Sequence, residues 1–265
     1  MSQSSEPTAT SAEVRAPTTS AFGDLSRGTL RGVPFRALRA VLLLLCRLLL
    51  GMKVEGLANV PATGGVVLVS NHLHNADPVL ISIAFPRPLH FMAKKELFGV
   101  PVVGWGIRLV GSFPVDRGRA DRTAIRRAQA TLEQGIALGI FPEGTRSRTR
   151  RIARVHTGVG LVALRGNAPI LPMAITGSER LPGSGGKAPQ RGERRREVRI
   201  VFGEPFTLQA REDGKRMTAD EATDLIMRRA AALLPESYRG IYGSPESADS
   251  ASIASSAAGK SPDSS

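Results

Sequence analysis

Apolar positions in the middle of the chain fall into short continuous runs, each bounded by glycine, proline or charged residues. Runs of this length and composition predict buried β-strands. They cover residues 64–70, 88–94, 111–115, 136–141, 170–175 and 198–202. Longer segments with helical spacing lie between them, and this alternation favours an α/β fold with a mixed, largely parallel sheet flanked by helices.

Helices are predicted where apolar residues recur with a period near 3.6. The segments are residues 77–85, 100–109, 120–135 and 217–234. Asp77 is suited to the N-cap of the first helix, with Pro78 in its first turn. Thr218 and Glu221 have the spacing of a capping box, which would fix the start of the last helix.

A leucine-rich segment, residues 35–52, precedes the first strand. Its longest unbroken apolar run, residues 40–46, is far shorter than the ~20 residues that a membrane span needs. Arg36, Arg39 and Arg47 share one stripe of a helix, and leucines cover the rest. We therefore predict an interfacial, membrane-docking helix whose arginines face lipid phosphates. The alternative is a buried helix whose arginines extend along its surface to water.

Composition divides the chain into four regions. Residues 1–24 and 239–265 are rich in small and polar residues, and we predict disordered tails because such segments cannot offset the ordering entropy by burial. Residues 25–53 form the N-terminal membrane-docking helical segment, and residues 54–238 the folded domain. Residues 1–24 do not fit a secretory signal, because the start is uncharged and the apolar run comes too late.

The chain is strongly basic, with 36 Lys and Arg residues against 23 Asp and Glu, a net charge of +13. This balance indicates an anionic partner: nucleic acid, anionic lipid or a phosphorylated substrate. Between Arg27 and Lys53 there are six basic residues and no acidic ones. Aromatic residues make up 5% of the chain and do not interleave with the basic runs, which argues against a nucleic-acid surface.

The single cysteine, Cys46, excludes an internal disulfide and fits a reducing compartment. It lies in the leucine-rich segment, so we interpret it as a small hydrophobic residue and a poor candidate for a nucleophile.

The first candidate for chemistry follows the strand at residues 64–70, where His72 precedes Asp77 by five positions. Active sites of α/β sheets gather at the carboxyl ends of strands. A histidine there can take a proton from a hydroxyl near neutral pH, and a carboxylate can orient its ring. The alternatives are a loop histidine for His72 and a plain helix cap for Asp77.

Two further polar motifs also follow strands. Residues 141–147 read Phe-Pro-Glu-Gly-Thr-Arg-Ser; Gly144 allows close backbone approach to a ligand, and Arg146 offers a planar fork of donors suited to phosphate. Residues 111–117 end in the charged pair Asp116 and Arg117. The alternatives are a surface turn with a solvated arginine for the first motif, and an ordinary salt-bridged turn for the second.

In their order along the chain, these motifs resemble those of the 1-acylglycerol-3-phosphate acyltransferase (PlsC-like) family of glycerolipid acyltransferases. The matching blocks are Asn-His-x-x-x-x-Asp, Phe-Met-Ala-Lys-Lys-Glu-Leu at 91–97, Gly-x-Phe-x-x-Asp-Arg, Phe-Pro-Glu-Gly-Thr-Arg-Ser and Leu-Pro-Met-Ala-Ile at 171–175. They extend over about residues 54–206. Any one block is weak, whereas five blocks in order are specific.

The resemblance implies a membrane enzyme of phospholipid biosynthesis, which moves a fatty acyl group from acyl-CoA or acyl-carrier protein to the hydroxyl of a lysophospholipid. The implied acceptor is 1-acylglycerol-3-phosphate, and the product is phosphatidic acid. The resemblance makes His72 the general base and Asp77 the residue that orients it. It also implies a set of acceptor-binding residues, with arginine on the phosphate: Arg117, Glu143, Gly144, Thr145 and Arg146.

The implied partners are the lysophospholipid, the acyl donor and an anionic membrane surface, without nucleic acid. The implied location is the cytoplasmic face of the cell membrane, as a peripheral or monotopic protein. Direct transfer from the thioester to the acceptor needs no acyl-enzyme, metal or other cofactor. His72, His74 and Asp77 could be read as metal ligands, but no cysteine or second carboxylate lies near them in the sequence.

Two departures from the family's pattern leave the acceptor open. Residues 155–158 read Val-His-Thr-Gly where the family often has Phe-Lys-x-Gly, and Pro114 replaces a β-branched residue. Glycerol-3-phosphate or another lysolipid are therefore alternative acceptors. An alternative of another class is a non-catalytic basic protein that binds membranes or nucleic acid, and the His72–Asp77 pair and the Glu-Gly-Thr-Arg block argue against it.

Overall fold

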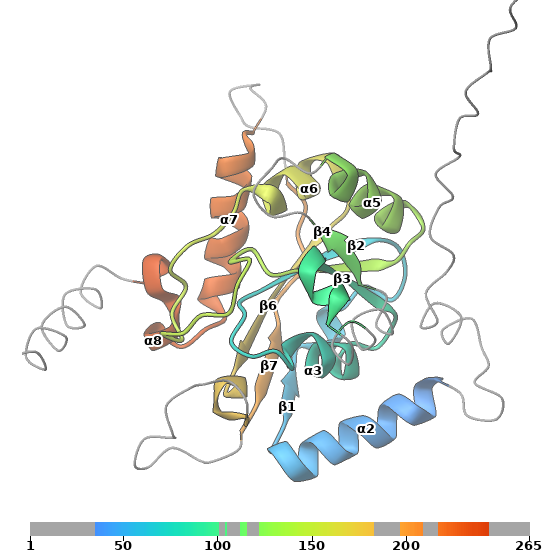
Figure 1. Ribbon diagram of the computed structural model, residues 1–265, viewed down its shortest axis with the longest axis vertical. Coiled ribbons are helices and arrows are strands. Elements are labelled where there is room, and N and C mark those ends of the chain that lie inside the picture. The colour runs from blue at the N-terminus through green and yellow to red at the C-terminus, as the bar shows by residue number, and fades with distance from the viewer. Residues whose placement is uncertain are drawn as a thin grey trace, which may run out of the picture.

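The computed structural model describes residues 35–100, 104, 112–115, 122–182, 197–208 and 217–243. Within these residues the strands form a seven-stranded sheet with helices on both of its faces (Figure 1). The α/β fold with a mixed, largely parallel sheet, predicted from the sequence, is confirmed.

The sheet has the strand order β1-β7-β6-β2-β5-β3-β4. Its strands are β1 (Lys53–Glu55), β2 (Val66–Ser70), β3 (Leu89–Lys94), β4 (Phe113–Val115), β5 (Ala137–Ile140), β6 (Ile170–Thr176) and β7 (Arg199–Phe202). The five strands from β6 to β4 run parallel, β7 pairs antiparallel with β6, and β1 pairs parallel with β7. The carboxyl ends of β2, β4, β5 and β6 therefore meet at one edge of the sheet.

Helices cover both faces of this sheet. They are α2 (Phe35–Leu50), α3 (Asp77–Ala84), α5 (Arg122–Glu133), α6 (Gly158–Gly166), α7 (Ala219–Ala232) and α8 (Glu236–Arg239). Successive residues of β2 point to opposite faces: Val66 and Leu68 belong to the core under α2 and α3, whereas Val67 and Val69 belong to the core under α5, α6 and α7. A strand buried on both faces must be apolar throughout, which explains the continuous runs in the sequence.

The start of α7 confirms the predicted capping box. The hydroxyl of Thr218 accepts the N–H of Glu221, and the carboxylate of Glu221 accepts the N–H of Thr218 at 2.8 Å. The predicted cap of α3 is wrong, because Ala76 is its N-cap and Asp77 makes no capping bond. The Asp77 carboxylate turns back toward the preceding loop instead. The predicted helix over residues 100–109 falls largely outside the described residues.

The sequence patterns did not reveal β1 or α6. The strand β1 has only three residues, and α6 contains three glycines, which lower its helix propensity. One of these glycines is needed for packing, because a Cβ on Gly160 would lie 2.1 Å from the carbonyl oxygen of Ala219 in α7. The close contact of α6 and α7 thus requires Gly160, one of the glycines that weaken the helical pattern of α6 in the sequence.

Helix α2 packs one side on the domain and turns the other outward (Figure 1). The guanidinium of Arg39 donates to the carbonyl oxygen of Ala84 in α3 at 2.7 Å, so the expectation that the arginines face lipid phosphates is wrong for Arg39. The outward side is apolar and exposed, and its residues are Val41, Leu44, Leu45, Leu48 and Leu49. Among the residues that the structure describes, no helix combines the length and the apolar content needed to cross a bilayer.

The described structure continues to residue 243, five residues beyond the predicted end of the folded domain at residue 238. A 3-10 turn, Gly240–Tyr242, follows α8. Its Ile241 N–H donates to the carbonyl oxygen of Ile152 at 3.0 Å, and the N–H of Ile152 donates to the carbonyl oxygen of Tyr238. These bonds fasten the C-terminal end of the domain to the loop that follows the Glu-Gly-Thr-Arg block.

Candidate active site

The candidate active site lies where β2 and β5 end. These strands are parallel neighbours, with Val69 opposite Ile140, so the loops that follow them leave the sheet side by side. A backbone hydrogen bond joins the two loops, because the N–H of Ser147 donates to the carbonyl oxygen of His72 at 2.8 Å. The fold thus brings together two motifs that are far apart in the sequence.

Asp77 organises the histidine loop through a single oxygen. Its Oδ2 lies 2.9 Å from Nδ1 of His72 and accepts the backbone N–H groups of Leu73 and His74 at 2.7 Å each. The Asp77 side chain is fully buried, whereas that of His72 is 15% exposed. A carboxylate in this position can hold a proton on Nδ1, which leaves Nε2 as the nitrogen able to accept one.

Aromatic rings support the imidazole from one side. The ring of His72 stacks on Phe141, with centroids 4.2 Å apart, and Phe141 stacks on Phe91 at 5.4 Å. Phe91 lies against Gly139 of β5, where a Cβ would come within 2.4 Å of the phenyl ring. A glycine inside a strand therefore makes room for the stack. This support could not be predicted from the pattern of the strands, because the contact between Phe91 and Gly139 depends on the pairing of β3 with β5.

Glu143 also contacts the histidine loop, through the backbone of His72. Its Oε1 accepts the backbone N–H of His72 at 3.0 Å, and its side chain is buried, with the residue 5% exposed. Burial raises the pKa of Glu143 to about 7; the hydrogen bond from His72 opposes this rise, and the nearby Asp77 charge adds to it. The predicted acceptor-binding residue Glu143 is thus attached to the main chain of the candidate base.

The loop that carries Glu143 turns at Gly144, whose φ of 66° suits glycine. The turn leaves Thr145 exposed and Arg146 partly exposed, directly before the residue that bonds to His72. No hydrogen bond or ion pair ties the Arg146 guanidinium to another residue in the described part of the chain. Its donors are therefore available to an anion.

Asn71 holds the end of β2 to the end of β6. Its side-chain amide donates to the carbonyl oxygen of Ile175 and accepts the N–H of the same residue, both at 2.9 Å. This pair of bonds extends the ladder between the strands by one step and fixes the chain immediately before His72. Asn71 is part of the sequence motif, but its role depends on the neighbouring strand and could not be read from the motif.

Arg117, the remaining residue expected to bind the acceptor, lies outside the described residues. Its strand, β4, ends at Val115 and is three strands from β2. At a strand spacing of ~4.8 Å, this places the end of β4 about 14 Å from the end of β2. The loop that carries Arg146 follows β5, which is the direct neighbour of β2.

His74 faces its own loop. Its Nδ1 accepts the N–H of Ala76 at 3.0 Å, and the residue is buried. Across the described ranges, no three side chains of His, Cys, Asp or Glu are grouped in a way that could hold a metal ion.

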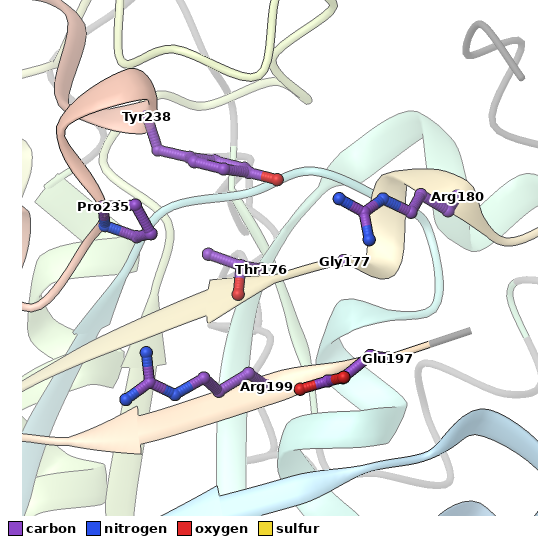
Figure 2. Close-up of a pocket in the computed structure, with 7 residues that line it drawn as sticks. All are labelled: Thr176, Gly177, Arg180, Glu197, Arg199, Pro235 and Tyr238. Atoms are coloured by element: carbon purple, nitrogen blue, oxygen red, sulfur yellow. The ribbon is translucent and has the colours of Figure 1, made fainter. Parts of the chain in front are cut away.

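A surface hollow of about 290 Å³ lies at the same edge of the sheet, beside the end of β6 (Figure 2). It is lined by Thr176, Gly177, Arg180, Glu197, Arg199, Pro235 and Tyr238. Each charged residue of this lining already has an opposite partner: Arg180 has Glu179, Glu197 has Lys53, and Arg199 has Glu55. The charged side chains that line the hollow are therefore engaged in ion pairs within the protein.

Several known proteins are similar to this chain in sequence. A family model described as Acyltransferase matches residues 51–176, a range that includes His72, the Glu-Gly-Thr-Arg block and residues 171–175. The 1-acyl-sn-glycerol-3-phosphate acyltransferase of Bacillus subtilis is 32% identical over 157 residues, which are 59% of this chain and 74% of that protein.

Other relatives are matched over smaller shares of their length. The 1-acyl-sn-glycerol-3-phosphate acyltransferase of Streptococcus pneumoniae is 33% identical over 62% of this chain and 56% of its own length. The chloroplastic LPAT1 of Arabidopsis thaliana is 28% identical over 51% of this chain and 38% of its own length. Among solved structures, the PlsC acyltransferase of Thermotoga maritima superimposes with a TM-score of 0.51 and 26% identity, over 69% of this chain and 71% of that one.

Proposed function

The chain belongs to the 1-acylglycerol-3-phosphate acyltransferase family and is an acyltransferase, and from this premise we propose that it converts lysophosphatidic acid to phosphatidic acid with His72 as general base. The observation that carries the proposal is the bond between Nδ1 of His72 and the buried carboxylate of Asp77. It leaves Nε2 to receive the proton of an acceptor hydroxyl.

In the proposed reaction, Nε2 of His72 removes the hydroxyl proton while the hydroxyl oxygen attacks the thioester carbonyl of the donor. A new C–O bond forms, the C–S bond breaks, and the thiolate leaves with the electron pair. The proton held by His72 can then pass to the thiolate. Asp77 stabilises the imidazolium that exists between the two proton transfers.

The proposed phosphate contact is made by Arg146. Arg146 directly precedes Ser147, whose N–H donates to the carbonyl oxygen of His72. We therefore propose that a phosphate bound by this loop holds the acceptor near the base. Arginine suits this contact because its planar fork can donate two hydrogen bonds to one phosphate. Thr145 and the backbone around Gly144 are further candidate contacts, and Arg117 remains a candidate from β4.

The proposed donor is acyl-CoA or acyl-carrier protein, and the reaction uses no cofactor. The direct transfer needs no nucleophile on the protein. Cys46, the single cysteine of the chain, lies on α2 and packs against the core, which is consistent with a direct transfer. Activity that survives exhaustive treatment with EDTA would agree with this proposal, and loss of activity restored by a metal ion would contradict it.

We place the enzyme on the cytoplasmic face of the cell membrane as a peripheral or monotopic protein. The apolar outward side of α2 supports the attachment to a membrane, since five large aliphatic side chains face away from the domain. A helix of this kind binds in the interface by burying its apolar side among the acyl chains. An acceptor with one acyl chain resides in the same layer, with its phosphate at the level of the headgroups.

A panel of acceptors tests the function. Purified enzyme would be given an acyl-CoA with lysophosphatidic acid, glycerol-3-phosphate, lysophosphatidylcholine or monoacylglycerol, and the product identified by mass spectrometry. Phosphatidic acid formed from lysophosphatidic acid, at a kcat/KM above that of the other acceptors, supports the proposal. A higher kcat/KM for another acceptor would replace lysophosphatidic acid as the substrate.

A further inference from the structure

Both polar groups of the His72 main chain are held by one loop. The N–H of His72 donates to the Glu143 carboxyl group at 3.0 Å, and its carbonyl oxygen accepts the N–H of Ser147 at 2.8 Å. Glu143 and Ser147 both belong to the loop after β5, whereas His72 follows β2. The peptide groups on both sides of the candidate base are therefore fixed by the Phe-Pro-Glu-Gly-Thr-Arg-Ser block.

We propose that Glu143 is a positioning residue for His72 and does not bind the acceptor. This inference rests on the proposed function of the site and reassigns a residue that the family resemblance places among the acceptor contacts. Glu143 is 5% exposed, and its described hydrogen bond goes to a backbone amide of the same protein. A residue so placed acts on the substrate through the base that it holds.

The two carboxyl groups divide the work of placing the imidazole. Asp77 bonds to Nδ1 and sets the orientation of the ring. Glu143 bonds to the main chain of His72 and sets the position of the backbone from which the side chain extends. Both settings are needed because a displacement of ~1 Å between reacting groups can lower a rate by ~10²-fold. Phe141 limits the ring on one face, but stacked rings can slide past each other, so the stack alone does not fix the position of Nε2.

The hydrogen bond from the N–H of His72 to Glu143 does not depend on the charge of Glu143. Its Oε1 can accept the N–H of His72 as part of a carboxylate or as the carbonyl oxygen of a neutral carboxylic acid. An amide oxygen can do the same, so Glu143→Gln keeps the bond. Glu143→Leu fills a similar volume but offers no acceptor, so it leaves the N–H of His72 buried without a partner.

Arg146 lies between the two residues that hold His72. A phosphate bound by Arg146 would therefore be held by the same loop that places the base. Because Glu143→Leu removes the bond to His72 but keeps Arg146, it should lower the rate of the chemical step even when the acceptor is saturating.

The test compares Glu143→Gln and Glu143→Leu with wild-type enzyme, and Glu133→Leu, an exposed position of α5, serves as the matched control. We expect Glu143→Leu to lower kcat by ~10-fold to 10²-fold with little change in the acceptor KM. Glu143→Gln should keep most of kcat and the wild-type acceptor KM. An acceptor KM that rises in Glu143→Gln while kcat is kept would make Glu143 an acceptor ligand and overturn the proposal.

A second measurement separates positioning from binding and does not need turnover. Lysophosphatidic acid is titrated into His72→Ala and into the double variant His72→Ala with Glu143→Gln, and equal Kd values are expected. A weaker Kd in the double variant would show that Glu143 touches the acceptor. Failure of the proposed function is a different result, namely that wild-type enzyme forms no phosphatidic acid.

Discussion

The Oδ2 atom of Asp77 lies 2.9 Å from Nδ1 of His72 and also accepts the backbone N–H groups of Leu73 and His74. One buried oxygen thereby shapes the loop and orients the ring that the loop carries. The first helical turn of α3 supplies this oxygen, so the candidate base, His72, is oriented by a residue of a regular element.

Asp77→Asn is expected to lower kcat strongly. The amide can still accept or donate hydrogen bonds, but it carries no charge to stabilise the imidazolium, and it can hold the wrong tautomer of His72. A loss of at least ~10²-fold is expected, measured as thiol release from acyl-CoA at saturating lysophosphatidic acid. Asp220→Asn, at an exposed position of α7, is the control. A near wild-type kcat in Asp77→Asn would remove the aspartate from the mechanism.

Arg146→Ala is expected to raise the acceptor KM more than the donor KM. The variant loses charge-assisted hydrogen bonds to the phosphate, which are among the stronger polar contacts. Arg146→Lys should restore the acceptor KM only in part, because a single ammonium replaces the planar fork. Arg165→Ala, on the exposed side of α6, controls for the loss of a positive charge. An unchanged acceptor KM in Arg146→Ala would move the phosphate site elsewhere, with Arg117 as the next candidate.

Charges on the outward side of α2 are expected to weaken membrane binding. Leu48 is 73% exposed and Leu44 is 54% exposed, so replacing both with Glu should leave the domain folded. Burying two leucines in the interface is worth about 3 kcal/mol or more, which corresponds to roughly 10²-fold in partitioning. The measurement is co-sedimentation with vesicles that contain anionic lipid, and Leu164→Glu, on α6, is the control. Equal binding by the double variant and wild type would rule out this face as the docking surface.

Glu143→Gln is expected to change the dependence of stability on pH. Burial raises the pKa of Glu143 from its ordinary value of 4.5 to about 7, so the folded state binds the proton more tightly than the unfolded state. The free energy of unfolding should therefore fall as pH rises from about 4.5 to about 7 and level off above that. The free energy of unfolding of Glu143→Gln, taken relative to wild type, should therefore be about 2 kcal/mol higher at pH 8 than at pH 5.

Denaturant unfolding of wild type and Glu143→Gln at the two pH values checks this prediction. Glu133→Gln should show no such difference, since its side chain is exposed on α5. A difference between wild type and Glu143→Gln that stays constant from pH 5 to pH 8 would mean that Glu143 titrates normally in the folded state.

The sheet and the His72–Asp77 pair could be predicted because their signals are local. Buried strands appear as continuous apolar runs, and a histidine that follows such a run is placed at the carboxyl edge without knowledge of the rest of the chain. The bond from Glu143 to His72 could not be predicted in this way. It exists because β5 lies beside β2, and the order of strands in a sheet is not written in the pattern of either strand.

Two other predictions failed because a side chain makes a tertiary contact in place of the local role that its sequence position suggests. Asp77 has the sequence of a helix cap, but its carboxylate is taken by the histidine loop. Arg39 looks like a residue for lipid phosphates, but its guanidinium satisfies a carbonyl group near the end of α3. In both cases a tertiary contact competes with the local preference and prevails.

If His72 is the base for acyl transfer to lysophosphatidic acid, its removal should abolish transfer. The decisive measurement is the rate of thiol release from acyl-CoA by wild type and His72→Ala, with and without this acceptor. Arg165→Ala, on the exposed side of α6, is the control, and circular dichroism checks the fold of each variant. We expect acceptor-dependent release by wild type and by the control, and a loss of ~10²-fold to 10⁴-fold in His72→Ala. Near wild-type release by folded His72→Ala would show that another group takes the proton.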